Sequence, residues 1–156
     1  MELYRITQEL YCDDLTGNGS KLFGGRWNRE GSPALYTASS RSLALLETLA
    51  HAPAQMLQQK TYILVTIFVP DTVLKQVVDF KKLPAGWDAT DIHPFTQETG
   101  NSFLAENKHL FLSAPSVLMP EENICVLNPL NHDMKKVKTV QKRRIHFDKR
   151  VENNLQ

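Results

Sequence analysis

Residues 40–51 of the chain read SRSLALLETLAH, and the remaining sequence can be placed around them. We expect a helix here, because a serine, Ser39 or Ser40, can cap its first turn and apolar residues then recur at three- and four-residue spacing. No Gly or Pro interrupts this pattern before Pro53, which ends it. Leucines and alanines cover much of the circumference, so the pattern indicates a helix that is largely buried.

Glu47 falls inside the apolar stripe that Leu43, Leu46 and Ala50 form. No Lys or Arg stands three or four residues away on either side, so no helical neighbour of this kind can neutralise the carboxylate. An ionised carboxylate that faces a core is costly unless a distant group pairs with it, and such groups are often functional. The alternative is a helix edge at which Glu47 reaches solvent. The helix sequence alone leaves both interpretations open.

Around this helix the sequence predicts a sheet within one domain, residues 1–150, followed by a frayed end, residues 151–156. Residues 61–69 form the strongest strand pattern, and their near-continuous apolarity indicates an interior strand. We expect further elements at the positions that follow: strands at 3–6, 34–37, 124–129 and 145–147, a short strand that starts at Ser116, and a second helix at 100–109.

The composition is that of an ordinary globular protein, with 42% apolar and 22% charged residues. The N-terminal sequence does not resemble a signal peptide, and the longest apolar run, residues 63–70, is too short to span a bilayer, so we expect a cytoplasmic protein. Cys12 and Cys125 lie far apart without a CxxC or a His at ligand spacing. They therefore indicate neither a zinc site nor a disulfide framework.

Charge is distributed unevenly along the chain. Residues 135–150 hold eight of the 18 basic residues, whereas residues 1–134 hold ten basic and fifteen acidic residues. The same end of the chain, to residue 156, has only Asp148 and Glu152 as acidic residues, so an acidic body of about −5 carries a basic end of about +6, which suggests that this end has a partner. The partner is either an acidic protein or nucleic acid. The basic end has no helix-turn-helix pattern and no interleaved aromatics with which to read or stack bases.

Two candidate side chains precede the helix. Arg26 follows a glycine pair in the segment FGGRWN, residues 23–28, and its guanidinium is suited to phosphate or carboxylate oxygens. A structural arginine that binds loop carbonyls is the alternative, and the sequence does not separate the two. Tyr36 stands at a strand end, from where it and Glu47 could face one cavity.

Ser116 is the last candidate. The sequence lacks GxSxG and SxxK, and no His is placed to activate this serine, so we do not expect a nucleophile. A hydrogen-bonding hydroxyl and a turn-capping serine are both compatible with its position before a Pro-Glu-Glu turn. Gly17 and Gly19 indicate a turn rather than a phosphate loop, because GxxxxGK[ST] is absent. Trp87 reads as a packed lid or, less commonly, as a surface on which a ligand stacks.

In combination these segments resemble the RES domain family, which is named after Arg, Glu and Ser. The resemblance covers residues 4–129, with a weaker match at 147–148, and residues 71–98 contribute nothing to it. The matching segments are YRI at 4–6, GGRWN at 24–28, LYT at 35–37, LLE at 45–47, PSVLMPEE at 115–122 and LNP at 127–129.

The resemblance implies the toxin of a bacterial Xre–RES toxin–antitoxin pair. It implies an α+β fold, a single compact domain whose mixed central sheet is flanked by helices, similar to ADP-ribosyltransferase toxins. NAD is the implied substrate, without a metal, and the implied partner is a helix-turn-helix antitoxin of the Xre type, through which alone the complex would reach DNA. Carried over residue by residue, the site comprises Arg26, Tyr36, Glu47 and Ser116, with Arg5 as a weaker addition.

The chemistry of these side chains fits cleavage of the bond between nicotinamide and ribose. That reaction passes through an oxocarbenium-like cation, which Glu47 would stabilise. Arg26 would hold the pyrophosphate, Tyr36 the nicotinamide end and Ser116 a ribose or amide group. Water as acceptor gives NAD hydrolysis, phosphate gives phosphorolysis, and a protein side chain gives ADP-ribosylation. Because no acceptor-binding element is recognisable, we favour hydrolysis or phosphorolysis. A non-enzymatic nucleic-acid-binding module that uses the basic end is the alternative of another class.

Overall fold

The computed structural model describes residues 1–153, which form one mixed sheet with helices packed against it. The sheet order is β4-β5-β6-β2-β1-β3-β7, in which β4 runs parallel to β5 and the remaining neighbours are antiparallel. The strands are β1 (Glu2–Gln8), β2 (Leu35–Ala38), β3 (Tyr62–Phe68), β4 (Lys75–Val77), β5 (Phe111–Pro115), β6 (Asn123–Leu127) and β7 (Lys138–Ile145). This confirms the α+β fold class.

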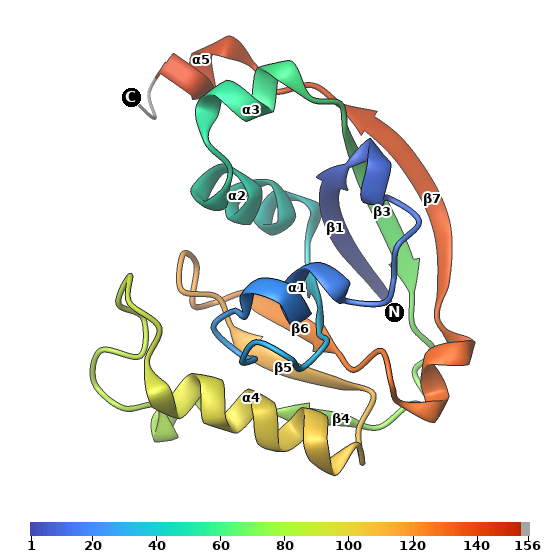
Figure 1. The fold of residues 1–156 in the computed structure, drawn as a ribbon, viewed down its shortest axis with the longest axis vertical. Helices are drawn as coiled ribbons and strands as arrows, with labels where there is room; N and C mark the ends of the chain where they lie inside the picture. Colours follow the sequence, from blue (N-terminus) through green and yellow to red (C-terminus); the bar gives the residue numbers. More distant parts are fainter. Residues whose placement is uncertain (154–156) are drawn as a thin grey trace.

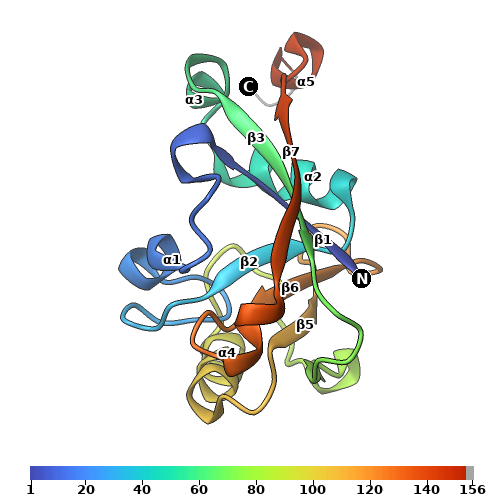
Figure 2. The same cartoon turned by 90° about the vertical axis from the view of Figure 1, so that its right-hand side faces the viewer.

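The sheet opens between its two halves. Where β1 meets β2, only Tyr4 and Ala38 pair among the described residues, whereas β1 pairs with β3 along its whole length. Figure 2 shows β1 and β2 diverging from this crossing point. The segment of residues 9–34, with the short helix α1 (Asn18–Phe23), lies at the resulting opening.

β3 is the interior strand that its sequence predicts. Residues 62–67 are all buried, and both edges of the strand are paired, to β1 and to β7. Alternate residues of β3 reach the two faces of the sheet, so a strand buried on both faces has an almost continuous apolar sequence. One face joins the two halves of the sheet in a single core, in which Leu3 and Val65 share a cluster with Phe111 and Leu127.

Two helices pack on the other face (Figure 1). α2 (Arg41–His51) contributes Leu43 and Ala44 to a cluster with Tyr4, Ala38 and Leu64. α4 (Pro94–Glu106) contributes Phe103, which packs over β5 and β6. The remaining helical elements are α3 (Ala54–Gln59), α5 (Lys149–Asn153) and three 3₁₀ turns, Glu9–Tyr11, Phe80–Lys82 and His132–Lys136.

The helix predicted at 40–51 is confirmed as α2. Ser40 is its cap and accepts a hydrogen bond of 3.0 Å from the Leu43 amide. The expectation that the helix is largely buried is wrong, because Leu46 is 37% exposed and Ala50 is also exposed. Only one side of α2 meets the sheet, through Leu43 and Ala44. The apolar stripe on which Glu47 was placed is therefore partly a surface.

α4 starts before the predicted helix at 100–109. Pro94 occupies its first turn, where the missing amide proton is not needed, and His93 Nδ1 accepts from the Phe95 amide at 3.1 Å. Gly100 thus lies inside the helix rather than at its start. A Cβ at Gly100 would lie 1.9 Å from the carbonyl oxygen of Trp27, so glycine lets α4 pack directly on the backbone of the GGRWN segment.

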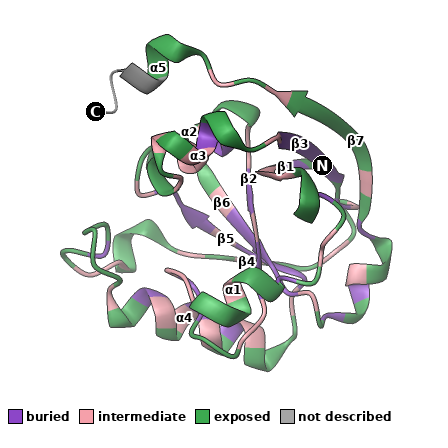
Figure 3. Ribbon diagram, turned by 45° about the horizontal axis from the view of Figure 1, so that its top comes forward, coloured by how far each residue is buried: buried purple, intermediate pink, exposed green. Residues whose placement is uncertain are grey.

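The basic end of the chain is an edge strand. The last strand was expected at 145–147, but β7 covers Lys138–Ile145 and pairs with β3 along its length. Figure 3 shows that β7 is largely exposed, in contrast to the buried β3 and β5. Lysines and arginines on such an edge prevent pairing with other chains, which accounts for the charges inside a strand. The predicted frayed end begins within α5, and its part at 154–156 lies outside the described residues.

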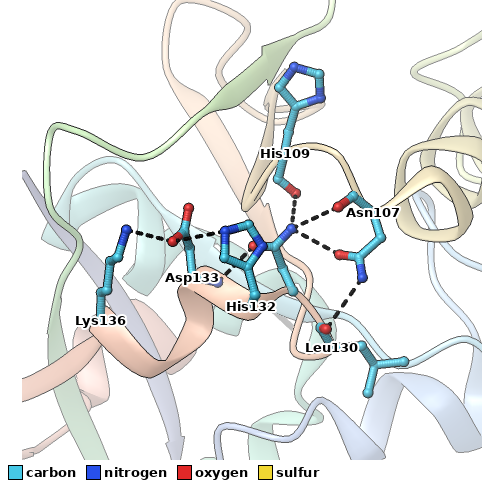
Figure 4. Close-up of polar contacts among 7 residues, drawn as sticks. Asn107, His109, Leu130, His132, Asp133 and Lys136 are labelled. Atoms are coloured by element: carbon cyan, nitrogen blue, oxygen red, sulfur yellow. Dashed lines mark hydrogen bonds and ion pairs between the residues drawn. The ribbon is translucent and has the colours of Figure 1, made fainter.

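The short strand expected from Ser116 onward is absent at that position, because β5 ends at Pro115 and Ser116 follows it. The LNP segment at 127–129 has a structural role. Asn128 and Asn131 both donate to Oδ1 of Asn107, at 3.0 and 2.9 Å, and Asn107 donates to the Leu130 carbonyl at 3.3 Å. Figure 4 shows Asn107 beside the loop that carries Leu130 and Asp133. Because Asn107 ends α4 with a φ of 51°, these contacts tie the helix end to the loop after β6.

None of the helices in the described part of the chain has both the length and the apolar content that a membrane span requires. Cys12 and Cys125 are buried free thiols.

Candidate functional site

Glu47 and Ser116 meet directly. The Ser116 hydroxyl donates to Glu47 Oε1 at 2.8 Å, although the two residues are 69 positions apart in the chain. Ser116 is fully buried, and the Glu47 side chain is 23% exposed. Glu47 is therefore neither an unpaired core carboxylate nor a freely solvated one, because Ser116, which directly follows β5, is its partner.

Ser116 also caps the turn that follows β5. Its oxygen accepts from the amides of Leu118 and Met119, at 3.0 and 3.2 Å. With both amides directed at the oxygen, the hydroxyl proton is left for Glu47. The two roles that the sequence left open for Ser116, turn cap and hydrogen-bonding hydroxyl, are thus both present.

The second oxygen of Glu47 is open. Oε2 lies 3.8 Å from His51 Nδ1, which is beyond hydrogen-bond length, and it takes no hydrogen bond from any residue in the part of the chain that the structure describes. His51 Nδ1 is instead 2.7 Å from the backbone carbonyl of Glu47, and the His51 side chain is 78% exposed. One carboxylate oxygen is fixed and the other is free to accept from a ligand hydroxyl.

Glu122 ties this pair together from behind. Its backbone carbonyl accepts from the Ser116 amide at 2.9 Å, and its side chain accepts from the Ser40 hydroxyl at 2.6 Å. Since Ser40 caps α2, one residue of the Pro-Glu-Glu turn holds both the serine and the start of the helix that carries Glu47. The sequence analysis did not assign this role, although the PEE segment was part of the matched pattern.

Tyr36 organises the GGRWN segment. Its hydroxyl accepts from the Trp27 amide at 2.9 Å and donates to Asn28 Oδ1 at 2.7 Å. A Cβ at Gly25 would lie 2.7 Å from this hydroxyl, so the second glycine makes room for it. Burial raises the pKa of Tyr36 well above its usual value of 10, more than the Trp27 amide and the Arg26 charge lower it.

Arg26 spans two loops. Its guanidinium donates to the carbonyl of Trp87 at 2.6 Å and to that of Ala89 at 2.7 Å. Trp87 is buried and stacks edge-on against Phe80, with ring centroids 6.0 Å apart. The structure therefore shows the carbonyl-binding role of Arg26 and the packed role of Trp87. A contact of Arg26 with phosphate stays a prediction.

Arg5 lies at the opening of the sheet. It donates to the Asp14 carbonyl at 2.6 Å, and burial lowers the pKa of its guanidinium. Together with Tyr36 and residues 17–20 it lines a cavity of about 200 Å³. Glu47 does not line this cavity, so the expectation that Tyr36 and Glu47 share one is not met there.

Tyr36 and the end of β5 that leads to Ser116 nevertheless share one face of the sheet, whereas Arg5 belongs to the opposite face with Leu3 and Val65. Tyr36 stands opposite Val126, and Val126 opposite Leu112, which places these side chains on the face that α4 covers. Ser116 lies two strands across and four residues along from Tyr36, roughly 10 Å by 13 Å from strand geometry. Ala38 and Ala114, both buried, belong to this intervening face.

The geometry thus gives two groups. Glu47, in the middle of α2, and Ser116 form a carboxylate–hydroxyl pair, and Arg26 and Tyr36 hold the GGRWN segment beside α4. Asn28 and Gln97 belong to the second group, because Gln97 donates to the carbonyls of Gly25 and Asn28, at 3.3 and 3.2 Å. Neither residue was singled out as a functional candidate from the sequence, although Asn28 belongs to the GGRWN motif.

Comparison with known proteins identifies the family of the chain. The family model of the RES domain matches residues 2–148. The "Prs ADP-ribosylating toxin" of Sphingobium sp. (strain YBL2) is 40% identical, over 90% of this chain and 88% of the relative. "Toxin Res" of Photorhabdus laumondii is 35% identical, over 97% of both chains.

The fold is also similar to a solved structure. It matches a chain in the crystal structure of the M. tuberculosis MbcT–MbcA toxin–antitoxin complex with a TM-score of 0.75 and 23% identity, over 99% of this chain and 87% of the other. At this identity the likeness concerns the fold. The match of the family model and the identity to full-length relatives show that this chain belongs to the RES domain family.

Proposed function

We propose that this chain is the toxin of a toxin–antitoxin pair and that it cleaves the nicotinamide–ribose bond of NAD. The observation that carries the proposal is the Glu47–Ser116 pair, a carboxylate with one oxygen fixed at 2.8 Å and the other open. The names of the relatives, "Toxin Res" and "Prs ADP-ribosylating toxin", support it.

In the proposed reaction the bond between ribose C1′ and the nicotinamide ring nitrogen breaks. The electron pair leaves with the ring, which departs neutral, and positive charge develops on the ribose. The fixed carboxylate of Glu47 stabilises this charge, while its open Oε2 accepts a hydrogen bond from a ribose hydroxyl. Water then bonds to C1′ and releases a proton, so the products are ADP-ribose and nicotinamide.

Ser116 acts through Glu47 in this scheme. The buried hydroxyl and the turn behind it hold the carboxylate in one position, so no reorganisation is needed when charge develops. Tyr36 and Arg26 position the GGRWN segment, which lies where the rest of the dinucleotide would extend along the sheet. Arg26 has further N–H donors beyond those that bind Trp87 and Ala89, and these are available for the pyrophosphate.

Transfer of ADP-ribose to a protein is the second candidate. It uses the same bond cleavage with a protein side chain in place of water. The name of the relative that is 40% identical favours it, because that protein is described as ADP-ribosylating.

An antitoxin is the proposed partner, in keeping with the toxin–antitoxin complex to which the fold is similar. We expect it to be a helix-turn-helix protein of the Xre type and to bring any DNA contact to the complex.

The test uses purified chain and NAD, with the products separated by mass spectrometry. Free ADP-ribose indicates hydrolysis. ADP-ribose with a phosphate on the carbon that held nicotinamide, formed when phosphate is added, indicates phosphorolysis. A protein whose mass has increased by one ADP-ribose group indicates transfer. Glu47→Gln should strongly slow formation of whichever product forms, and Glu98→Gln, on the exposed side of α4, is the matched control. Intact NAD after long incubation with the unmodified chain, with and without candidate acceptor proteins, would reject the proposal.

A further inference from the structure

A second cavity lies on the opposite end of the molecule from the GGRWN segment. Its volume is about 110 Å³, and it lies between the end of α3 and the end of β7. The polar lining includes Lys60, Thr61, Arg144 and His146. None of the residues that line it is acidic, and none belongs to the candidate site.

The basic side chains around this cavity have no carboxylate partner in the described part of the chain. Lys60, Arg144 and His146 form no ion pair there, whereas other basic residues of the same region do. The ion pairs of that region are Lys142 with Asp13, Lys136 with Asp133, and Arg150 with Asp148. Asp13, Asp133 and Asp148 are thus engaged elsewhere, and no carboxylate among the side chains that the structure describes compensates the basic charge at the cavity.

The cavity also has fixed walls. Arg144 donates to the Thr61 hydroxyl oxygen at 3.2 Å, which joins the two sides of the opening and leaves the hydroxyl proton for another acceptor. Phe147 packs edge-on against Tyr62 with ring centroids 5.2 Å apart, which holds the segment after β7 in place. Arg144 keeps further N–H donors beyond the one that Thr61 uses.

We propose that this cavity binds the phosphate group of a small phosphorylated ligand. A water molecule occupies ~30 Å³, so the cavity has room for a single tetrahedral oxyanion and not for a nucleoside. A guanidinium, an ammonium and a hydroxyl donor around one small recess are the groups that recognise phosphate oxygens. Arg144 and His146, which belong to the basic segment near the C-terminal end, thus line a single site.

The test measures binding of inorganic phosphate and of AMP to the purified chain by amide chemical shifts, with chloride at equal ionic strength as reference. We expect saturable shifts confined to residues 58–61 and 144–147. Arg144→Gln should weaken binding about tenfold, because one charge-assisted hydrogen bond is lost. Arg143→Gln is the matched control, since Arg143 is the neighbour of Arg144 on β7, does not line the cavity and should leave affinity within about twofold.

Two results would overturn the site. Shifts that rise without saturation, or equally with chloride, would show non-specific attraction. Equal loss with Arg143→Gln and Arg144→Gln, together with tighter binding of a DNA duplex, would assign the charge to a nucleic-acid surface instead. Lys60→Gln should also weaken phosphate binding, because the ammonium lines the cavity. A fold check by circular dichroism accompanies each variant, and a second variant, Thr61→Val, tests the hydroxyl without changing charge.

Discussion

Ser116 donates its hydroxyl proton to Glu47 across 69 positions of the chain, at 2.8 Å, while two amides of its own turn bind the same hydroxyl oxygen. The buried serine thereby gives the carboxylate a fixed position and leaves its second oxygen open. Most of the site chemistry that we propose depends on this one contact.

Glu47→Gln should lower the rate of NAD cleavage by roughly a hundredfold or more, since the neutral amide cannot stabilise a developing cation. The substitution keeps the size of the side chain and, through the amide oxygen, an acceptor for Ser116, so KM should change less than the rate. Steady-state kinetics with NAD measure both. A change in KM alone would mean that Glu47 binds substrate and does not act in the transition state.

Ser116→Ala should cost stability as well as rate. It leaves the amides of Leu118 and Met119 without their acceptor and Glu47 without its donor, which together should lower the free energy of unfolding by about 1–3 kcal/mol. Urea unfolding provides the measurement, and Ser102→Ala, at an exposed position of α4, is the control. A rate loss without any loss of stability would contradict the capping role.

Arg26→Lys should loosen the loop around Trp87 and Ala89, because an ammonium cannot bind both carbonyls in the way that a planar guanidinium does. Hydrogen exchange of residues 86–91 should become faster while exchange in β3 stays unchanged. Arg29→Lys, at a nearby exposed position, should have no such effect. Unchanged exchange in this loop would show that the two carbonyl contacts do not hold it.

Gly100→Ala should destabilise the fold by about 3 kcal/mol or more, because the new Cβ would collide with the Trp27 carbonyl. Gly19→Ala is the control, because Gly19 also lies in a helix, α1, but a Cβ there would have open space around it. This substitution should leave the stability unchanged or raise it slightly. Urea unfolding of both variants tests the contact, and equal stabilities would show that α4 does not pack on the GGRWN backbone.

The sequence was sufficient for the elements whose information is local. α2 and its Ser40 cap follow from spacing and residue type, and β3 follows from its continuous apolarity. The RES pattern then located Glu47 and Ser116. Their contact could not be derived from either segment, since it depends on how β5 and α2 meet across the sheet.

Other features of the structure could not be recognised from the types of the side chains involved. Arg26 binds backbone carbonyls, which any residue supplies, so its acceptors in residues 86–91 were not predictable. The predicted helix started at Gly100, whereas α4 starts at Pro94 and Gly100 inside it makes a contact with Trp27, far away in sequence, that no local pattern indicates. β7 was missed because an exposed edge strand with charges on both faces lacks an apolar alternation.

Tyr36 should make the stability of the fold depend on alkaline pH. Burial raises its pKa above the usual value of 10, so between these two values the unfolded chain has released the phenol proton and the folded chain has not. The folded state then binds more protons, and stability falls as pH rises above about 10. Below that pH the contribution is fully present.

Urea unfolding between neutral pH and pH above 10 should show a free energy of unfolding that declines less steeply in Tyr36→Phe. At neutral pH the free energy of unfolding of Tyr36→Phe should also be lower by about 1–3 kcal/mol, because Asn28 and the Trp27 amide lose their partner. Tyr11→Phe, at an exposed position, should keep the full slope, and an identical slope in Tyr36→Phe would show that the buried phenol does not control it.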